Sequence, residues 1–289
     1  MSAVPSPSSL NWALDIQDEE LSIYRSDRNR KIVLSRPRNG NALTTAMVSR
    51  LTNFFHEASR DKHISRIIIT AQGKFFCTGM DLGKSRTAVN QGEDASSNEY
   101  HKFVGLFQAI QDSPQVTIAV INGPCYAGGI GLAFSCDIRL AVVSATATLS
   151  EVKLGLCPAI ISRYLVREWG AVFTREAMLS GRTVSMTELK GIGAVHGIAD
   201  DIPRLEELTT SYLRRLRACA PLASTMCKEA VTVACSIQVP ERRHAVIQRI
   251  FKDMMRDGSE SSVGVRNFQA KKQQIDWDAL HEPGTLSKL

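Results

Sequence analysis

Blocks of apolar residues alternate with polar turns along the first two hundred residues of the chain. Two short apolar runs within residues 21–37 flank a polar turn that contains Asp27 and Asn29, which predicts two strands. Residues 41–61 then repeat their apolar positions at helical spacing, and residues 63–73 contain a continuous apolar run. This second pair predicts a helix followed by a buried strand.

The same succession occurs a second time. We expect a helix in FVGLFQAIQDS, a strand in QVTIAVING, a glycine turn, a further helix and a strand in IRLAVVS. The polar residues 84–101, between the two successions, predict a mobile loop. Strands that are apolar on both faces and alternate with helices are typical of an α/β fold with a largely parallel sheet.

The pattern changes at about Ile202, where strand signals end. Three amphipathic stretches follow, LEELTTSYLRRLRACA, PLASTMCKEAVTVACS and PERRHAVIQRIFKDMMRD. A helical region of this kind covers the body of a protein or pairs with another subunit. We therefore expect a disordered, Ser- and Pro-rich arm in residues 1–10, an α/β core in residues 11–201 and a helical region in residues 202–289.

Composition narrows the class of protein. The 289 residues are 44% hydrophobic and 22% charged, as in a soluble globular protein with a sizeable core. No apolar run is long enough to cross a bilayer, and the N-terminus lacks the basic and apolar regions of a signal peptide. Seven cysteines without a CxxC pair, and six scattered histidines, favour reduced thiols over disulfides or a metal site. We expect an intracellular protein without a metal or a membrane partner.

Two further features concern partners and location. The net charge of +6 suits nucleic acid, but the basic residues are spread along the chain with little aromatic interleaving. A site for a phosphate-bearing small molecule uses this charge equally well, and we expect no nucleic-acid partner. The last residues, Ser287, Lys288 and Leu289, match the peroxisomal address SKL, so we expect the peroxisomal import receptor as a partner and a peroxisomal location, otherwise a cytoplasmic one.

Three segments carry candidate chemistry: FFCTGMDL (75–82), GPCYAGGIGLAFSCD (123–137) and LSEVKLGLCPA (149–159). The first two each end a buried strand in a glycine-bearing turn, which exposes backbone N–H groups. Two such groups aimed at one point form an oxyanion hole. The pair Gly128 and Gly129 indicates a close approach to the backbone, a positive φ, or a tight turn and nothing more.

Glu151 lies among apolar neighbours in the third segment. Desolvation there raises the pKa of a carboxyl group toward that of a general base, although a single glutamate is more often solvated or a helix cap. One carboxylate and an oxyanion hole suffice for enolate chemistry at a thioester. The chain has no GxGxxG after a strand, no GxxxxGK[ST] and no GxSxG, which disfavours the corresponding nucleotide folds and the nucleophile elbow.

The ordered motifs SRPRNGNAL, FFCTGMDL, INGPCYAGGIGLAFSCDIRLA and SEVKLGLCPA resemble the enoyl-CoA hydratase/isomerase (crotonase) superfamily, and VRNFQAKKQQIDW resembles its C-terminal segment. The resemblance implies a crotonase-like spiral of ββα units in residues 11–201, with a helical trimerisation region and tail in residues 202–289. It also implies a homotrimer or hexamer, an acyl-CoA substrate, and no cofactor beyond the coenzyme A of that substrate.

Carried over position by position, the resemblance makes the N–H groups of Met80 and Gly128 the oxyanion donors and Glu151 the acid/base. Gly129 lets the helix start close behind Gly128. The coenzyme A contacts that it implies are Gln72, Phe76, Lys84 and Lys271, although a lysine pair such as Lys271 and Lys272 in a terminal helix is usually a solvated face.

Other residues near these motifs have two interpretations. Tyr126 is a supplementary proton donor or a ring packed under the turn. Asp81 caps the following helix or takes part in catalysis. Arg163 and Tyr164 line the acyl pocket or serve packing. In each case the structural interpretation is the more common one.

The chain departs from typical hydratases at Gly131, where those enzymes carry a first glutamate. We expect a hydratase or dehydratase that works with the single Glu151, similar to methylglutaconyl-CoA hydratase-like and fungal peroxisomal members. The substrate is then a branched acyl-CoA of fungal secondary metabolism, as in mevalonyl-CoA dehydration. The alternatives are a Δ3,Δ2-enoyl-CoA isomerase and a non-catalytic acyl-CoA-binding protein.

Overall fold

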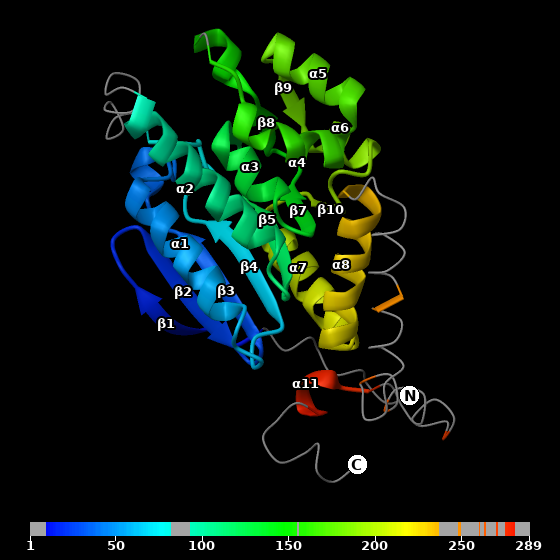
Figure 1. The fold of residues 1–289 in the computed structure, drawn as a ribbon. Coiled ribbons are helices and arrows are strands. Elements are labelled where there is room, and N and C mark those ends of the chain that lie inside the picture. Colours follow the sequence, from blue (N-terminus) through cyan, green and yellow to red (C-terminus); the bar gives the residue numbers. More distant parts are fainter. Residues whose placement is uncertain are drawn as a thin grey trace. The chain divides into compact units, whose positions relative to one another are not determined.

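The computed structural model describes residues 10–81, 93–154, 156–236, 248–249, 260, 263, 270 and 275–280 (Figure 1). The chain forms two compact units. The larger holds Met1–Ser113 and Thr117–Thr210, and the smaller holds Pro114–Val116 and Ser211–Leu289. Among the described residues, no helix combines the length and the apolar character needed to cross a membrane.

A seven-stranded sheet runs through the larger unit. Its strands are, in spatial order, β1 (Ala13–Gln17), β2 (Leu21–Ser26), β3 (Asn29–Leu34), β4 (Arg66–Ala71), β5 (Val116–Ile121), β7 (Ile138–Val142) and β10 (Gly197–Ala199). The pairs β1–β2 and β2–β3 are antiparallel, whereas β3–β4, β5–β7 and β7–β10 are parallel. A second sheet consists of β6 (Cys125–Tyr126), β8 (Thr146–Thr148) and β9 (Thr183–Ser185).

Helices separate the strands. They are α1 (Thr45–Ala58), α2 (Glu93–Gln111), α3 (Gly128–Phe134), α4 (Ala159–Trp169), α5 (Ala171–Ser180), α6 (Met186–Gly191), α7 (Ile202–Arg217), α8 (Pro221–Ser236) and α11 (Trp277–Leu280), with 3-10 helices η1 (Pro37–Asn39) and η2 (Ser150–Leu154). In Figure 1, α1 and α2 lie side by side over the sheet. The alternation of helices with parallel strands is the predicted α/β arrangement.

Local sequence explains the first helix and the strand after it. The side chain of Thr44 accepts a hydrogen bond from the N–H of Met47 (3.0 Å), which caps α1 at its N-terminus. The apolar side chains of α1 recur every three or four residues and face the core. Ile67, Ile68 and Ile69 of β4 are all buried, as expected for a strand covered on both faces.

The smaller unit is described mainly by the end of α7 and by α8. Thr225 Oγ1 donates to the carbonyl oxygen of Pro114 (2.9 Å), and Lys228 Nζ donates to that of Gln115 (2.7 Å). Arg217 forms an ion pair with Asp276 (2.7 Å). The first two of the three predicted amphipathic stretches are therefore helices, and most of the third lies outside the described residues.

One predicted loop is partly wrong. Residues 93–101 were expected in a mobile loop, but α2 begins at Glu93. Residues 93–101 contain neither glycine nor proline, so the helix predicted from Phe103 extends N-terminally through them. Residues 82–92 of that loop, and residues 1–9 of the predicted arm, lie outside the described residues.

Candidate active site

Three parallel backbone segments bring the predicted site residues to one edge. Tyr126 of β6 pairs with Thr148 of β8, and these two strands are parallel. Cys77 forms a parallel bridge with Cys125, so the CTGM segment runs in the same direction. The carboxyl ends of parallel segments meet at the same edge. Met80, Gly128 and Glu151 each follow three residues after Cys77, Cys125 and Thr148, respectively.

The turns that carry Met80 and Gly128 touch each other. A Cβ built on Gly79 would lie 3.0 Å from the nitrogen of Gly128, and one built on Gly128 would lie 3.8 Å from the nitrogen of Met80. Within the described part of the chain, neither of these two N–H groups donates to a protein acceptor. Two free backbone donors therefore stand next to each other, as an oxyanion hole requires.

The backbone strain of this turn falls on Ala127. Its φ of 47° and ψ of −125° are unusual for a residue with a side chain, whereas Gly128 and Gly129 form the first turn of α3 without a positive φ. The positive-φ interpretation of the glycine pair is therefore wrong, because the strained position precedes the pair. The N–H of Ala127 donates to the carbonyl oxygen of Thr148 (3.3 Å).

Close packing, by contrast, explains Gly129. A Cβ at this position would lie 2.2 Å from the carbonyl oxygen of Cys77, so that the backbone of one segment would have to shift. A Cβ on Gly128 would meet its nearest protein atom, Gly79 Cα, at 3.6 Å, an ordinary contact. The start of α3 therefore lies directly on the Cys77 segment, as the sequence predicted for Gly129.

The motif SRPRNGNAL holds the turn that carries Met80 in place through hydrogen bonds. Asn41 is fully buried and has a φ of 55°. Its Nδ2 donates to the carbonyl oxygens of Gln72 (2.9 Å) and Phe75 (2.8 Å), which fixes the chain as it leaves β4. Leu43 then pairs with the turn itself, since its N–H donates to Gly79 (2.7 Å) and its carbonyl accepts from Asp81 (3.0 Å).

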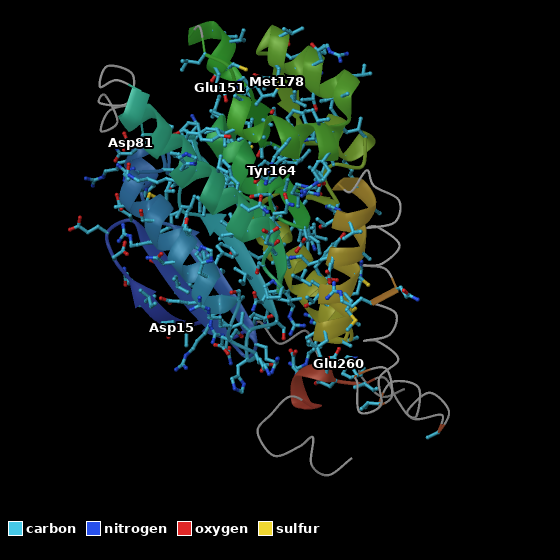
Figure 2. The ribbon with its side chains drawn as sticks, viewed as in Figure 1. Asp15, Asp81, Glu151, Tyr164, Met178 and Glu260 are labelled. Atoms are coloured by element: carbon cyan, nitrogen blue, oxygen red, sulfur yellow. The ribbon has the colours of Figure 1, made fainter. Side chains whose placement is uncertain are left out.

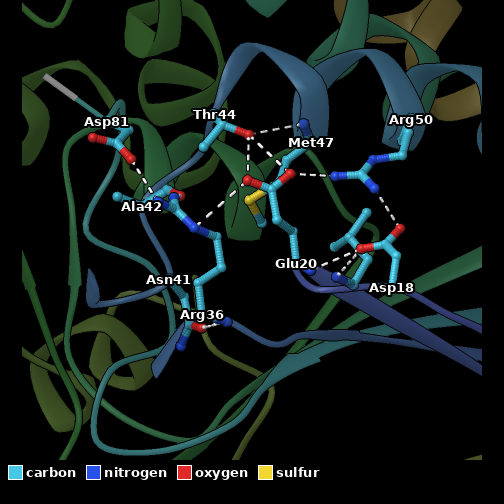
Figure 3. A network of polar contacts seen from close by, with 10 residues as sticks. Asp18, Glu20, Arg36, Asn41, Ala42, Thr44, Met47, Arg50 and Asp81 are labelled. Atoms are coloured by element: carbon cyan, nitrogen blue, oxygen red, sulfur yellow. Dashed lines mark hydrogen bonds and ion pairs between the residues drawn. The ribbon is translucent and has the colours of Figure 1, made fainter. Parts of the chain in front are cut away.

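Arg36 ties this support to Asp81 (Figure 3). Its Nη2 lies 2.8 Å from Asp81 Oδ2, its Nη1 donates to the carbonyl oxygen of Ala42 (2.5 Å), and its Nε lies 3.6 Å from Glu20. Glu20 is also paired with Arg50. The side chains of Arg36 and Asp81 are 9% and 13% exposed, so this is a largely buried ion pair beside Met80.

Glu151 lies in η2, with its side chain half-buried (Figure 2). Its Oε2 is buried and has no hydrogen-bond partner in the described part of the chain. Burial raises the pKa of the carboxyl group above 4.5, and a hydrogen bond from its own N–H opposes this shift. An orphaned carboxylate oxygen with a raised pKa is suited to taking up and returning a proton.

The other predicted site residues are distributed as follows. Phe76 is fully buried in the core, and Gln72 is exposed. Tyr126 packs its ring against Phe75 at 6.2 Å between centroids, which favours the packing interpretation. Gly131 is buried in α3 beside the side chain of Ile161. The remaining predicted residues, Lys84, Lys271, Lys272, Ser287, Lys288 and Leu289, lie outside the described residues.

Asp81, Arg163 and Tyr164 have protein partners. Asp81 pairs with Arg36, and residues 82–92, which follow it, lie outside the described residues, so its capping role stays a prediction. Arg163 Nη2 donates to the hydroxyl of Tyr164 (2.8 Å), and the Tyr164 side chain is buried. Burial raises the pKa of the Tyr164 hydroxyl, and the neighbouring Arg163 guanidinium opposes that shift.

The chain is similar to known proteins both in sequence and in fold. Two enoyl-CoA hydratases of Alternaria alternata are 42% and 41% identical to this chain, each over 86% of it, and the matches cover 81% and 80% of those proteins. The solved structure of Pseudomonas aeruginosa AtuE, 27% identical, superimposes with a TM-score of 0.84 over 90% of this chain and all of its own. An enoyl-CoA hydratase/isomerase from Marinobacter aquaeolei, 26% identical, gives a TM-score of 0.83 with the same coverage.

These neighbours confirm the predicted fold class, since the chain has the crotonase fold. The trimer expected for the helical region stays a prediction. The sequence profile of the enoyl-CoA hydratase/isomerase family matches residues 29–279, nearly the whole chain. The protein therefore belongs to the enoyl-CoA hydratase/isomerase family of enzymes.

Proposed function

We propose that this enzyme adds water reversibly across the α,β double bond of an acyl-CoA. The observation that carries the proposal lies at one edge of three parallel segments. There, within the described residues, the N–H groups of Met80 and Gly128 and the Oε2 atom of Glu151 have no protein hydrogen-bond partner. The relatives in Alternaria alternata are named enoyl-CoA hydratases, which supports the same reaction.

In hydration, the oxygen of a water molecule attacks the β-carbon while the Glu151 carboxylate accepts a proton from that water. The π electrons of the double bond move toward the thioester and leave an enolate, whose oxyanion the N–H groups of Met80 and Gly128 stabilise. The protonated Glu151 then gives a proton to the α-carbon, which restores the thioester carbonyl and the carboxylate. Dehydration is the reverse, and no group beyond the coenzyme A of the substrate is required.

Because Glu151 is the single candidate acid/base, it also bears on which substrate we expect. We propose a branched acyl-CoA that carries its own β-hydroxyl or carboxyl group, of the mevalonyl or methylglutaconyl type. Such a group takes over part of the work of a second protein acid. The absence of a side chain at Gly131 and the Alternaria alternata relatives support this substrate class without fixing it. A homotrimer or hexamer, and import into peroxisomes through Ser287, Lys288 and Leu289, remain part of the proposal.

A Δ3,Δ2-enoyl-CoA isomerase is the second candidate. The same single acid favours it, because one carboxylate that removes a proton from the α-carbon and returns it to the γ-carbon suffices for migration of a double bond. Water is neither consumed nor released in that reaction. Its mass balance therefore differs from that of a hydratase.

Mass spectrometry in deuterated water separates the candidates. Wild type and Glu151→Gln are incubated with crotonyl-CoA, 3-methylglutaconyl-CoA, a mevalonyl-type β-hydroxyacyl-CoA and a 3-enoyl-CoA. We expect a mass change of one water, present in wild type and lost in Glu151→Gln. Deuterium uptake with migration of the double bond alone identifies the isomerase. Binding of every acyl-CoA without turnover contradicts both and identifies a non-catalytic binding protein.

A further inference from the structure

Gly131, one turn after Gly128 in α3, has no room for a side chain. A Cβ built on it would lie 2.3 Å from Cγ2 of Ile161 and 2.9 Å from Cζ of Phe107. Carbon atoms in folded proteins do not approach so closely. Ile161 and Phe107 are 3% and 1% exposed. The space that even an alanine would need is therefore filled by these two hydrocarbon side chains.

This contact joins the two halves of the candidate site. Ile161 lies in the first turn of α4, which follows η2 in the chain. The N–H of Leu156, between η2 and α4, donates to the carbonyl oxygen of Glu151 (3.0 Å). On the other side, Gly131 is about 5 Å along the helix axis from Gly128. The contact thus connects the helix that begins at one candidate donor with the segment that carries the candidate acid/base.

A second contact holds α4 in this position. The ring of Phe107, from α2, meets the ring of Tyr164 edge-on, with centroids 5.8 Å apart and planes at 75°. Tyr164 follows Ile161 by three residues, so the two side chains lie on the same face of α4. Phe107 therefore touches both the gap at Gly131 and the next turn of α4. A shift of Ile161 would move the whole start of α4.

We propose that Ile161 is a positioning residue, whose Cγ2 methyl, seated in the gap at Gly131, sets the separation between the Gly128 N–H and the Glu151 carboxylate. The roles of those two groups rest on the proposed function. Ile161 acts through the packing of α3 on α4, and its place at Gly131 also closes that position to a second carboxyl side chain. Among the described residues of α3 and η2, the proton transfers therefore rely on Glu151.

A size-exchange experiment tests the contact. Gly131→Ala drives a new methyl against Cγ2 of Ile161. The double variant with Ile161→Ala removes that methyl, whereas the matched double variant with Ile161→Val keeps it. We expect kcat for crotonyl-CoA to fall between tenfold and a hundredfold in Gly131→Ala, with little change in KM. Activity recovers toward the level of Ile161→Ala alone in the double variant with Ile161→Ala, where only the contact with the Phe107 ring tip remains, and does not recover in the one with Ile161→Val.

A second readout needs no turnover. The Glu151 carboxyl is titrated by 13C NMR in each folded variant, and its signal is assigned by its loss in Glu151→Gln. Burial raises the pKa of this carboxyl, and Lys153 is the other charged side chain of η2. We expect the pKa to fall toward 4.5 in Gly131→Ala, because a displaced Glu151 is better hydrated, and to return in the double variant with Ile161→Ala.

The two readouts distinguish a failure of the positioning role from a failure of the proposed function. An unchanged Glu151 pKa across the folded variants overturns the positioning role, whatever the activity does. If wild type turns over no acyl-CoA, the proposed function fails, yet the titration still decides whether Ile161 positions Glu151. Thermal unfolding of every variant ensures that only folded protein is compared.

Discussion

Cys77 and Cys125 are bridge partners in two parallel segments, and both thiols are fully buried. Hydrogen bonds lie on both sides of the pair, from the N–H of Phe76 to Pro124 (3.1 Å) and from that of Tyr126 to Cys77 (3.0 Å). Burial raises the pKa of the Cys77 thiol to about 12, so it stays neutral and acts as a packing group. The two chains leave this pair side by side and reach their candidate donors three residues later.

The two adjacent glycines are predicted to respond differently to substitution. Gly129→Ala places its methyl 2.2 Å from the carbonyl oxygen of Cys77, and we expect a loss of about 1–3 kcal/mol in the free energy of unfolding. Gly128→Ala is the matched control for packing, because its nearest protein atoms lie at 3.6–3.9 Å. Its stability should stay within about 1 kcal/mol of wild type. Urea unfolding measures both.

The same control variant tests catalysis. The methyl of Gly128→Ala would lie 3.8 Å from the nitrogen of Met80, at the point where the two candidate donors converge. We expect kcat/KM to fall on the order of a hundredfold, as for loss of one oxyanion donor. Full activity in this variant would mean that the thioester oxygen binds elsewhere.

Ala127→Gly is predicted not to destabilise the protein, although most glycine substitutions do. At a φ of 47° and a ψ of −125° the alanine side chain is strained, and glycine relieves that strain. The relief of about 1–3 kcal/mol should offset the cost of about 0.5–1 kcal/mol that glycine incurs through the unfolded chain. Chemical denaturation of the variant is the measurement. A loss of 1 kcal/mol, roughly that of glycine in an ordinary helix, would argue against strain at this position.

The stability of Glu151→Gln relative to wild type should depend on pH. The folded-state pKa of Glu151 is raised above 4.5, so the folded protein binds this proton more tightly than the unfolded chain does. The contribution of Glu151 to stability is therefore full below pH 4.5 and is lost as the pH rises through the folded pKa. Gln carries no charge to desolvate. In urea titrations, Glu151→Gln should gain stability relative to wild type as the pH rises from 4.5 through the folded-state pKa of Glu151. A difference in stability that does not vary with pH would contradict the burial of this carboxyl group.

The largely buried ion pair between Arg36 and Asp81 is predicted to contribute more to stability and activity than an exposed ion pair does. Arg36→Ala leaves Asp81 and Glu20 without the guanidinium in a largely buried place, and we expect a loss of about 3 kcal/mol in stability together with reduced kcat. Arg204→Ala is the control, because the Arg204–Glu207 pair is about two-thirds exposed and should contribute little to stability. Thermal unfolding and steady-state assays compare the two variants. Equal effects would exclude a special role for Arg36.

The long elements of the fold could be predicted from the sequence, and so could the segments that carry the candidate site residues. The helix over residues 45–58 and the isoleucine strand after it have strong periodicity, and both lie where the pattern placed them. Glycine turns after apolar strands pointed to the two donor segments, and Glu151 stood out as an acid among apolar neighbours. The family resemblance then singled out Met80 and Gly128, and the roles of all three residues stay a prediction. Strands β6, β8 and β9 are too short to show a periodic pattern of apolar residues, although their pairing sets the register between the segments of the candidate site.

The supporting residues could not be found in the same way. The strain at Ala127 has no sequence signal, since alanine is expected in an ordinary backbone conformation. Asn41 and Arg36 lie in a motif that was noticed, but their bonds reach about 30 to 45 residues along the chain. Ile161 reads as one apolar residue of a helix, and only the three-dimensional contact with Gly131 distinguishes it. Tertiary packing determines the strain at Ala127, the long-range bonds of the SRPRNGNAL motif and the contact of Ile161.

The most direct test of the account is a crystal structure with a bound, slowly reacting acyl-CoA. We predict that the thioester oxygen lies about 2.7–3.1 Å from the nitrogens of both Met80 and Gly128, with the Glu151 carboxylate facing the α- and β-carbons. A thioester oxygen bound away from these two nitrogens, or a Glu151 carboxylate turned away from the acyl group, would contradict the central claim.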